Sequence, residues 1–140
     1  MQYLPSAGAD YYPLGNTGLF FSADAAYLFA AQEERYDPGL ILKGKAGIRL
    51  FKPLWIEPFI HYGKVSNYAD EDAFVIYNSH DVIDYWYGAR INIFLAGYKV
   101  NLYYIFQAYQ NTNYYNLAGV RGEIGYGSAT HLLGLKWKLR

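Results

Sequence analysis

Apolar and polar residues alternate with a period of two along most of the chain, a pattern typical of β-strands with one apolar and one polar face. The alternation predicts six strands, over residues 19–30, 41–51, 54–65, 83–94, 98–107 and 131–140. It is clearest at 41–51, where small and aliphatic residues alternate with lysine, glycine and arginine. These segments have roughly the 9 to 11 residues that a tilted strand needs to cross a bilayer.

The connections between the predicted strands fall into two classes. The turns at 52–54 and 96–97 are short, and Gly97 can supply the positive φ of a tight hairpin. The connections at 32–39, 66–81 and 110–130 are long and polar. Short turns at one end of a sheet and long loops at the other are typical of outer-membrane β-barrels.

The strand count leaves alternatives open. Residues 6–12 are a candidate seventh strand, followed by a turn at 13–18. Residues 120–126 either add a strand or extend the last hairpin. A barrel of about eight strands is just filled by its own side chains, but the alternation accounts for fewer than eight. We therefore expect that an N-terminal strand is missing or that the chain is part of a larger or multi-chain barrel.

The turns also predict register. We expect Phe51 to pair with Trp55, which would place Arg49 opposite Glu57. We expect Leu95 to pair with Tyr98. The same reasoning predicts further inward pairs, which are Gly47 with Phe59, Lys45 with His61, Gly88 with Ile105, Asn92 with Asn101, and Arg90 with Tyr103. Each pair keeps inward residues opposite inward residues, and the glycine pairs set a large side chain beside a small one.

One face of the sheet collects most of the charges. The expected lumen charge network consists of Asp24, Lys45, Arg49, Glu57, His61, Asp84, Arg90 and Lys136, with Lys43, Lys99 and Lys138 on the same face. These residues could line an anion-selective pore or bind a ligand. Charges confined together must pair or meet water, and narrow barrels fill with side chains. We therefore expect a salt-bridge network that plugs the interior.

The other face is apolar, and its aromatic residues suit the headgroup level of a bilayer. The expected aromatic girdle consists of Tyr27, Tyr62, Tyr85, Tyr104 and Trp137. Trp55 has the parity of the inward face. Because the inward face also holds several glycines and bulky apolar residues, it suits a cramped lumen better than a surface exposed to water.

Composition agrees with this fold class. The chain has 17 tyrosines and 20% aromatic residues, which favours strands. Twelve basic and twelve acidic residues cancel, so the net charge gives no support for a nucleic-acid partner. No cysteine is present, which excludes disulfides and thiolate metal sites. The first residues lack the pattern of a secretory signal peptide, so either such a segment was removed or the chain is not exported.

Candidate chemistry is sparse. His61, His80 and His131 share no metal-ligand spacing. The run 78–81 (Asn-Ser-His-Asp) holds residue types of a hydrolytic triad, yet neighbours in one segment point apart. The acidic run 70–72 could bind calcium but is typical of a solvated loop. We expect no catalytic activity, no metal and no cofactor.

Four segments in the second half of the chain resemble small outer-membrane β-barrel proteins of the outer-membrane protein A-like or opacity-protein-like group. They read FKPLWIEPFIHYG, DYWYGARINIF, YKVNLYYIF and HLLGLKWKL, and the resemblance covers about residues 42–140. It departs from the family at the C-terminus, which lacks a final aromatic residue. The resemblance implies a bacterial outer-membrane location and contact with outer-membrane lipid.

The sequence therefore predicts one domain, 1–140, that is all-β and forms an antiparallel up-and-down transmembrane β-barrel of about eight strands. The expected role is structural or surface-interacting, with protein or surface ligands at loops 32–39, 66–81 and 110–130. The alternatives are a soluble lipocalin-like ligand-binding barrel, a small pore, and a barrel enzyme that modifies lipid A.

Overall fold

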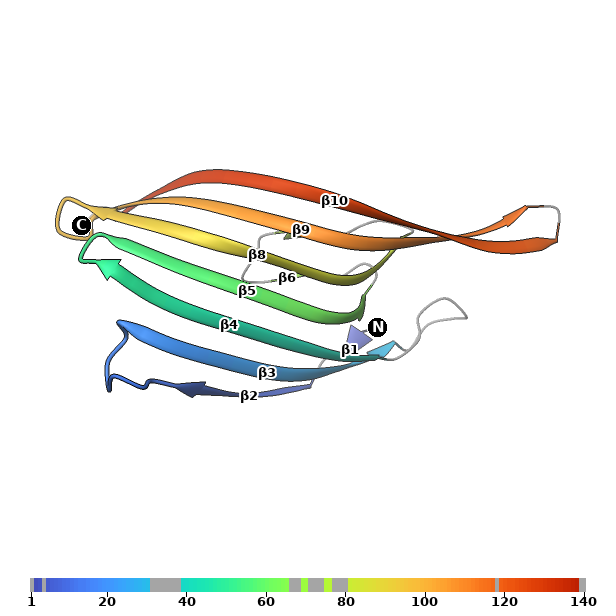
Figure 1. Cartoon of the computed structure of the whole chain (residues 1–140), viewed down its shortest axis with the longest axis horizontal. Helices are drawn as coiled ribbons and strands as arrows, with labels where there is room; N and C mark the ends of the chain where they lie inside the picture. Colours follow the sequence, from blue (N-terminus) through green and yellow to red (C-terminus); the bar gives the residue numbers. More distant parts are fainter. Residues whose placement is uncertain are drawn as a thin grey trace.

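The alternating segments fold into one curved antiparallel sheet (Figure 1). The computed structural model describes residues 2–3, 5–30, 39–65, 69–70, 75–76, 81–117 and 119–138, and no helix occurs in this part of the chain. The strands are β1 (Gln2–Tyr3), β2 (Ser6–Tyr11), β3 (Leu19–Ala30), β4 (Gly39–Phe51), β5 (Leu54–Val65), β6 (Ala69–Asp70), β7 (Val75–Ile76), β8 (Val82–Leu95), β9 (Val100–Leu117) and β10 (Val120–Trp137).

The strands follow an up-and-down order. β1 and β2 both pair with β3 along the edge that faces away from β4, so together they act as the first of seven antiparallel strands. The order continues through β4, β5, β8, β9 and β10, while β6 and β7 form a separate small hairpin. This confirms the all-β, antiparallel, up-and-down prediction. Within the described residues β10 pairs only with β9, so the sheet is not closed.

Most predicted strands lie where the alternation placed them. The strands expected at 19–30 and 54–65 are β3 and β5, and the strand expected at 83–94 is β8 with one more residue at each end. The candidate seventh strand is β2. Period-two patterning was sufficient here because each strand has one face toward the inside of the curve.

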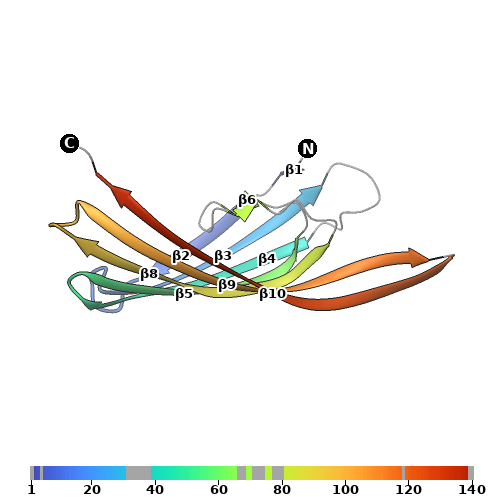
Figure 2. The same ribbon diagram turned by 90° about the horizontal axis from the view of Figure 1, so that it is seen from above.

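The prediction of a loop at 110–130 is wrong. β9 and β10 pair without interruption from Val100 with Trp137 to Leu117 with Val120, so residues 120–126 extend the last hairpin. Figures 1 and 2 show this hairpin reaching past the ends of the other strands. Its asparagines and glycines gave the segment a loop-like composition, but cross-strand pairing holds it extended.

Both predicted registers are two residues off. Arg49 pairs with Trp55 where Glu57 was expected, and Leu95 pairs with Val100 where Tyr98 was expected. Next to the first turn Phe51 pairs with Leu54, one residue from the prediction, and a bulge between Arg49 and Phe51 adds the second residue. The second turn is longer than expected because Tyr98, together with Ala96 and Gly97, takes a positive φ. A shift of two residues keeps every side chain on its face, so the inward and outward sets survive although their partners change.

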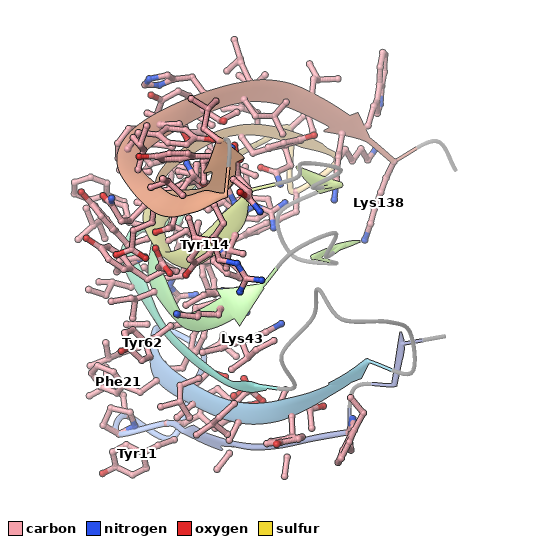
Figure 3. All side chains as sticks on the ribbon, turned by 90° about the vertical axis from the view of Figure 1, so that its right-hand side faces the viewer. Tyr11, Phe21, Lys43, Tyr62, Tyr114 and Lys138 are labelled. Carbon is pink, nitrogen blue, oxygen red and sulfur yellow. The ribbon has the colours of Figure 1, made fainter. Side chains whose placement is uncertain are left out.

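The two faces of the sheet are well separated. Figure 3 shows the sheet curving like an open barrel, with Phe21 and Tyr62 on the convex side and Lys43 on the concave side. The buried core lies inside the curve and consists of Ala26, Ile41, Ile83, Trp86 and Tyr109, with Phe59 packed against it. The small β6–β7 hairpin also lies on this concave side of the sheet (Figures 2 and 3).

The connections are segregated by end. The turns at 12–18, 52–53 and 96–99 lie together at one end of the sheet, and the tip of the β9–β10 hairpin lies at the other (Figure 1). Backbone hydrogen bonds tie the turn end together, from Phe94 N to Pro53 O (2.7 Å) and from Lys138 N to Lys99 O (2.9 Å). The loop prediction at 32–39 lies almost wholly outside the described residues, as does most of 66–81.

Candidate functional site

The convex face carries large apolar side chains that are exposed on nearly every strand. Exposure reaches 78% at Leu133 and 68% at Trp137. Other members with more than a third of their surface exposed are Phe21, Tyr27, Phe29, Leu40, Leu42, Ile48, Leu50, Ile60, Tyr62, Tyr85, Tyr87, Ile93, Leu95 and Leu135. A contiguous exposed apolar surface of this kind is uncommon on a soluble monomer and marks contact with lipid or with another apolar surface.

This surface, which we call the convex belt, has limits along β9 and β10. Outward residues are apolar or aromatic from Val100 to Ala108 on β9, and nearly so from Ala129 to Trp137 on β10. Beyond them most outward positions are polar or glycine, beginning with Gln110 and Gly127, and Tyr114 is the exception among the described residues. The belt is therefore nine residues long on these strands, which matches one tilted crossing of a bilayer.

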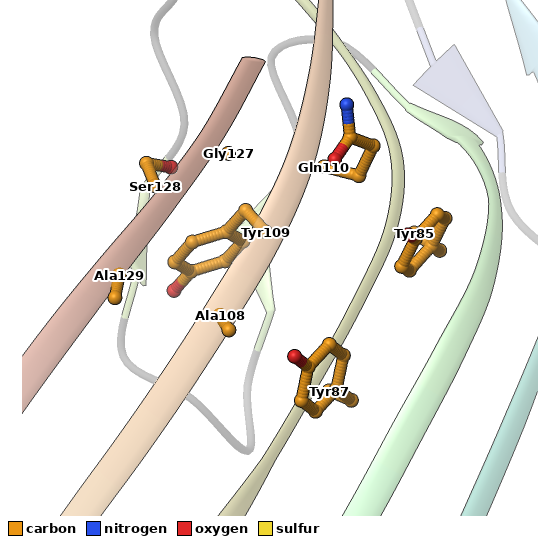
Figure 4. Close-up of a pocket in the computed structure, with 8 residues that line it drawn as sticks. All are labelled: Tyr85, Tyr87, Ala108, Tyr109, Gln110, Gly127, Ser128 and Ala129. Atoms are coloured by element: carbon orange, nitrogen blue, oxygen red, sulfur yellow. The ribbon is translucent and has the colours of Figure 1, made fainter. Parts of the chain in front are cut away.

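Two shallow grooves run along the convex belt. One, of about 490 Å³, is lined by Ile91, Ile93, Leu102, Tyr103, Tyr104, Leu133, Gly134 and Leu135. The other, of about 370 Å³, is shown in Figure 4, where Tyr87 on β8 lies beside Ala108 on β9, which in turn pairs with Ala129 on β10. The second groove exists because β9 and β10 carry alanine and glycine where β8 carries tyrosine.

The five expected girdle residues do not form one row. Tyr62 and Tyr85 pair directly across β5 and β8. Tyr104 lies between Ile91 and Leu133, in an aliphatic part of the belt, and Trp137 pairs with Val100 at the turn end. Tyr27 pairs with Leu40 near the opposite end of β3, where it contacts Phe29.

A polar pair lies within the convex belt. The hydroxyl of Tyr104 and Nδ1 of His131 are 2.7 Å apart, and their rings stack at 6.0 Å. The His131 ring also contacts Phe106 at 5.3 Å. The hydrogen bond satisfies a polar atom of each side chain, which lowers the cost of placing them on an apolar surface. The sequence pattern did not predict Tyr104 as a partner of His131.

The concave face has a buried aromatic and polar centre. The ring of His61 packs on Trp86 at 4.4 Å and on Phe59 at 5.7 Å. Next to them the Tyr109 hydroxyl donates to Oε1 of Gln107 at 2.6 Å. Trp86 is fully buried, and His61 and Gln107 are at most 5% exposed. These side chains lie together in the middle of the curve.

The expected charge network is placed in part as the sequence suggested. Register sets Glu57 opposite Arg90, and Asp24 opposite Lys43. Lys45 lies in the next row, between Ser22 and Phe59. All of these belong to the concave set. Opposite charges in directly paired positions are the arrangement that compensates ionic groups in a narrow space.

Three cations of this network contact aromatic rings. Arg49 lies 5.8 Å from the centre of the Trp55 ring. Arg90 and Lys136 lie 5.3 Å and 5.7 Å from the centre of the Tyr103 ring. Attraction between a cation and a ring face stabilises such contacts, more strongly where water is excluded. Tyr103 therefore contacts two cations of the network, which the charge pattern alone did not predict; its inward parity beside two bases was the available signal.

Asp84 is placed differently from the other expected lumen residues. It is the extra residue of a bulge, because Ile83 pairs with Asn111 and Tyr85 with the adjacent Gln110. Its carboxylate accepts a hydrogen bond from the Thr112 hydroxyl at 2.6 Å. This hydrogen bond places Asp84 beside Thr112 at the loop end of the sheet.

Glycines fit bulky neighbours on the concave face, as expected, but with other partners. An added Cβ on Gly88 would lie 2.8 Å from the Phe59 ring and 2.0 Å from the Phe106 carbonyl oxygen, and on Gly47 it would overlap the Phe20 ring. Gly134 is covered by the Tyr103 ring in the same way. Interiors of small barrels are filled by such large-beside-small pairs.

At the loop end, Asp81 joins β8 to the β9–β10 hairpin. Its carboxylate accepts hydrogen bonds from the Asn113 amide and the Tyr126 hydroxyl. The hydrogen bond to Asp81 raises the pKa of Tyr126, and burial and the negative charge add to the effect. Nearby, the hydrogen bond to Tyr114 raises the pKa of Lys64, with smaller contributions from Asp84 and Glu123.

The candidate hydrolytic triad and the candidate calcium site are not placed by the structure. Ser79 and His80 of the triad candidate, and Glu71 and Asp72 of the calcium candidate, lie outside the described residues. No group of three potential metal ligands occurs within the described ranges. The described part of the chain also holds no helix long and apolar enough to cross a membrane.

Comparisons with protein-family models, with curated proteins and with solved structures found no match to this chain.

Proposed function

We propose that this chain is a transmembrane β-barrel of a bacterial outer membrane, with a filled interior and a structural or surface-interaction role. The observation that carries the proposal is the distribution of polarity over the sheet. Large apolar side chains are exposed on the convex face, whereas the polar residues His61, Asn92, Gln107 and Asn111 are buried on the concave face. A soluble barrel has the opposite arrangement, because its interior is apolar and its outside meets water.

The direction of the two edge strands allows one further strand to close the sheet. Because the sheet has seven antiparallel strands, its edge strands β2 and β10 run in the same direction. One further strand between them, antiparallel to both, gives a closed barrel of eight. A bilayer requires such closure, since an unpaired strand edge in hydrocarbon costs several kcal/mol for each unsatisfied group.

The interior supports a plug rather than a pore. Trp86, Phe59 and Tyr109 meet in the middle of the curve, and Tyr103 with its two cations lies nearer the turn end. An eight-stranded barrel has room for little more than its own side chains. The role then falls to surfaces outside the barrel wall, above all the β9–β10 hairpin and the loops beside it.

Tryptophan quenching tests the orientation of the faces. The chain has three tryptophans, of which Trp137 is 68% exposed on the convex belt, Trp55 is half-buried and Trp86 is buried on the concave face. In vesicles of lipids brominated on the acyl chains, we expect strong quenching in the wild type and loss of most of that quenching in Trp137→Phe.

The matched control is Trp55→Phe, which should leave the quenched fraction of the remaining fluorescence at least as large as in the wild type. A monomer that stays soluble in plain buffer and shows no quenching would contradict the proposal and favour a soluble ligand-binding barrel.

A further inference from the structure

The tip of the β9–β10 hairpin, residues 113–124, reverses the polarity of the two faces. On the face that continues the concave side it carries Tyr115, Leu117, Val120 and Ile124. Leu117, Val120 and Ile124 are 73%, 68% and 57% exposed. The face that continues the convex belt carries the charged pair Arg121 and Glu123. An apolar face that begins where the belt ends is not a lipid contact of the barrel wall, so it needs another explanation.

The same tip has a free backbone edge. β10 pairs only with β9 among the described strands, and the tip extends past the ends of the other strands, so a further strand that closes the barrel wall need not cover its outer edge. Leu117 and Val120 close a two-residue turn whose second residue, Gly119, has φ 87°. In such a hairpin the closing pair exchanges its backbone hydrogen bonds, so Arg121, Glu123 and Gly125 direct theirs outward. An edge of this kind is a template for another strand.

The sequence of this edge is complementary to itself. In an antiparallel pair centred on Gly122, residue 121 of one chain lies opposite residue 123 of the other. Arg121 then faces Glu123 of the second copy on the polar side, and Val120 faces Ile124 on the apolar side. The two-fold axis passes between the two Gly122 residues, each covered by its own Tyr115 ring. Register also agrees, because Arg121 and Glu123 both direct their backbone groups outward.

We propose that the tip of β10 is a homotypic docking edge, which pairs antiparallel with the same edge of a second copy about Gly122. The result is a four-stranded sheet made of two hairpins. Its polar face carries alternating Arg121 and Glu123 from both copies, and its apolar face joins Leu117, Val120 and Ile124 of each copy. Opposite charges in directly opposed positions select this register, since a slip would bring like charges together.

The orientation of the two copies deepens the proposed function and rests on it. Two copies in one membrane have β10 strands that run in the same direction, so their tips could pair antiparallel only by lying flat on the membrane. Two copies in facing membranes have β10 strands that run in opposite directions, so their tips can pair antiparallel. The docking edge therefore joins opposed membranes, and Asp81 holds the base of the tip through Asn113 and Tyr126 so that the edge is already ordered before contact.

Lys64 is the intramolecular competitor for Glu123. It donates to the Tyr114 hydroxyl at 3.5 Å, and the negative charge of Glu123 contributes a little to the raised pKa of Lys64. Tyr114 and Glu123 are paired in register, so Lys64 reaches the polar face from β5. Because Lys64 is exposed and screened by solvent, it leaves Glu123 available for Arg121 of the second copy.

Charge reversal in detergent tests the pairing without any membrane. We expect the wild type to dimerise in sedimentation analysis, and both Arg121→Glu and Glu123→Arg to weaken the dimer at least tenfold, because each places like charges opposite each other. A mixture of the two single variants should dimerise like the wild type, since each supplies the charges that the other needs. The control is Lys99→Glu at the turn end, which should dimerise normally.

Vesicles test the orientation. Two populations of proteoliposomes, one with Arg121→Glu and one with Glu123→Arg, should aggregate only when mixed. Dimers in detergent without aggregation of vesicles would overturn the facing-membrane arrangement and leave the edge pairing intact. Absence of dimers in the wild type, or failure of the mixture to restore them, would overturn the docking edge itself, whatever the outcome of the quenching experiment.

Discussion

At the scale of single residues, the concave face is shaped by which side chain lies against which glycine. Gly88 faces Phe59 and Gly47 faces Phe20, whereas the sequence paired Gly47 with Phe59. The need for a small residue beside a large one was predictable from the inward parity of both. The partner was not, because it depends on a register that a shorter turn and the bulge after Arg49 together shift by two residues.

Gly88 supplies a stability test. In Gly88→Ala the new Cβ would meet the Phe106 carbonyl oxygen at 2.0 Å, a backbone contact that cannot move alone. We expect a loss of about 1 to 3 kcal/mol, the usual cost of overpacking, measured by urea unfolding from detergent or lipid. Gly127→Ala is the control, since its Cβ has ordinary contact with Tyr109 O at 3.7 Å. Equal losses in both variants would contradict this account.

Tyr126 supplies a test of pH dependence. Its pKa is raised above the ordinary 10.0, because the neutral hydroxyl donates to Asp81. A raised pKa in the folded state means that this contact stabilises the hairpin base below about pH 10 and is lost as pH rises through the folded value. In an ultraviolet phenolate titration, Asp81→Asn should move one tyrosine back toward its ordinary pKa, and Tyr126→Phe should remove that same titration. A titration unchanged in Asp81→Asn would refute the assignment.

At the scale of elements, the β9–β10 hairpin shows what composition obscures. Residues 110–130 are rich in asparagine, glycine and threonine, which favours a loop. Yet the two-residue alternation continues on both strands, and the apolar positions change face near Asn111 and Tyr126. An alternation pattern that keeps apolar residues on the convex face does not fit this segment. The pairing of β9 with β10 shows that the alternation continues with the apolar residues on the other face.

Removal of the tip tests its independence. Replacing residues 114–123 by Asn-Gly, a favoured hairpin turn, joins Asn113 to Ile124, which are already paired and exchange their backbone hydrogen bonds. We expect the thermal midpoint of the remaining sheet to change by no more than a few degrees, because the tip contributes nothing to the core cluster. Circular dichroism during heating measures it. Dimerisation should be lost, and unfolding of the whole sheet would show that the tip is part of the fold.

At the scale of the whole molecule, the filled interior has an electrical consequence. We expect purified protein in planar bilayers to show no steady conductance, because Trp86, His61 and Phe59 occupy the middle of the curve. Trp86→Ala, which removes the largest fully buried side chain, should add brief, small openings or destabilise the barrel. A steady anion-selective current in the wild type would show that the lysines and arginines line an open path.

The sequence alone determined the class of structure and the sorting of its faces, because alternation with a period of two is written locally in each strand. It placed Lys45, Glu57 and Arg90 on one face and Ile48, Ile60 and Leu133 on the other, and the structure keeps that division. Only the tertiary structure decided which residues pair across neighbouring strands. Bulges after Arg49 and at Asp84, the positive φ of Tyr98 and the long pairing of β9 with β10 depend on contacts between strands distant in sequence, which no local pattern contains.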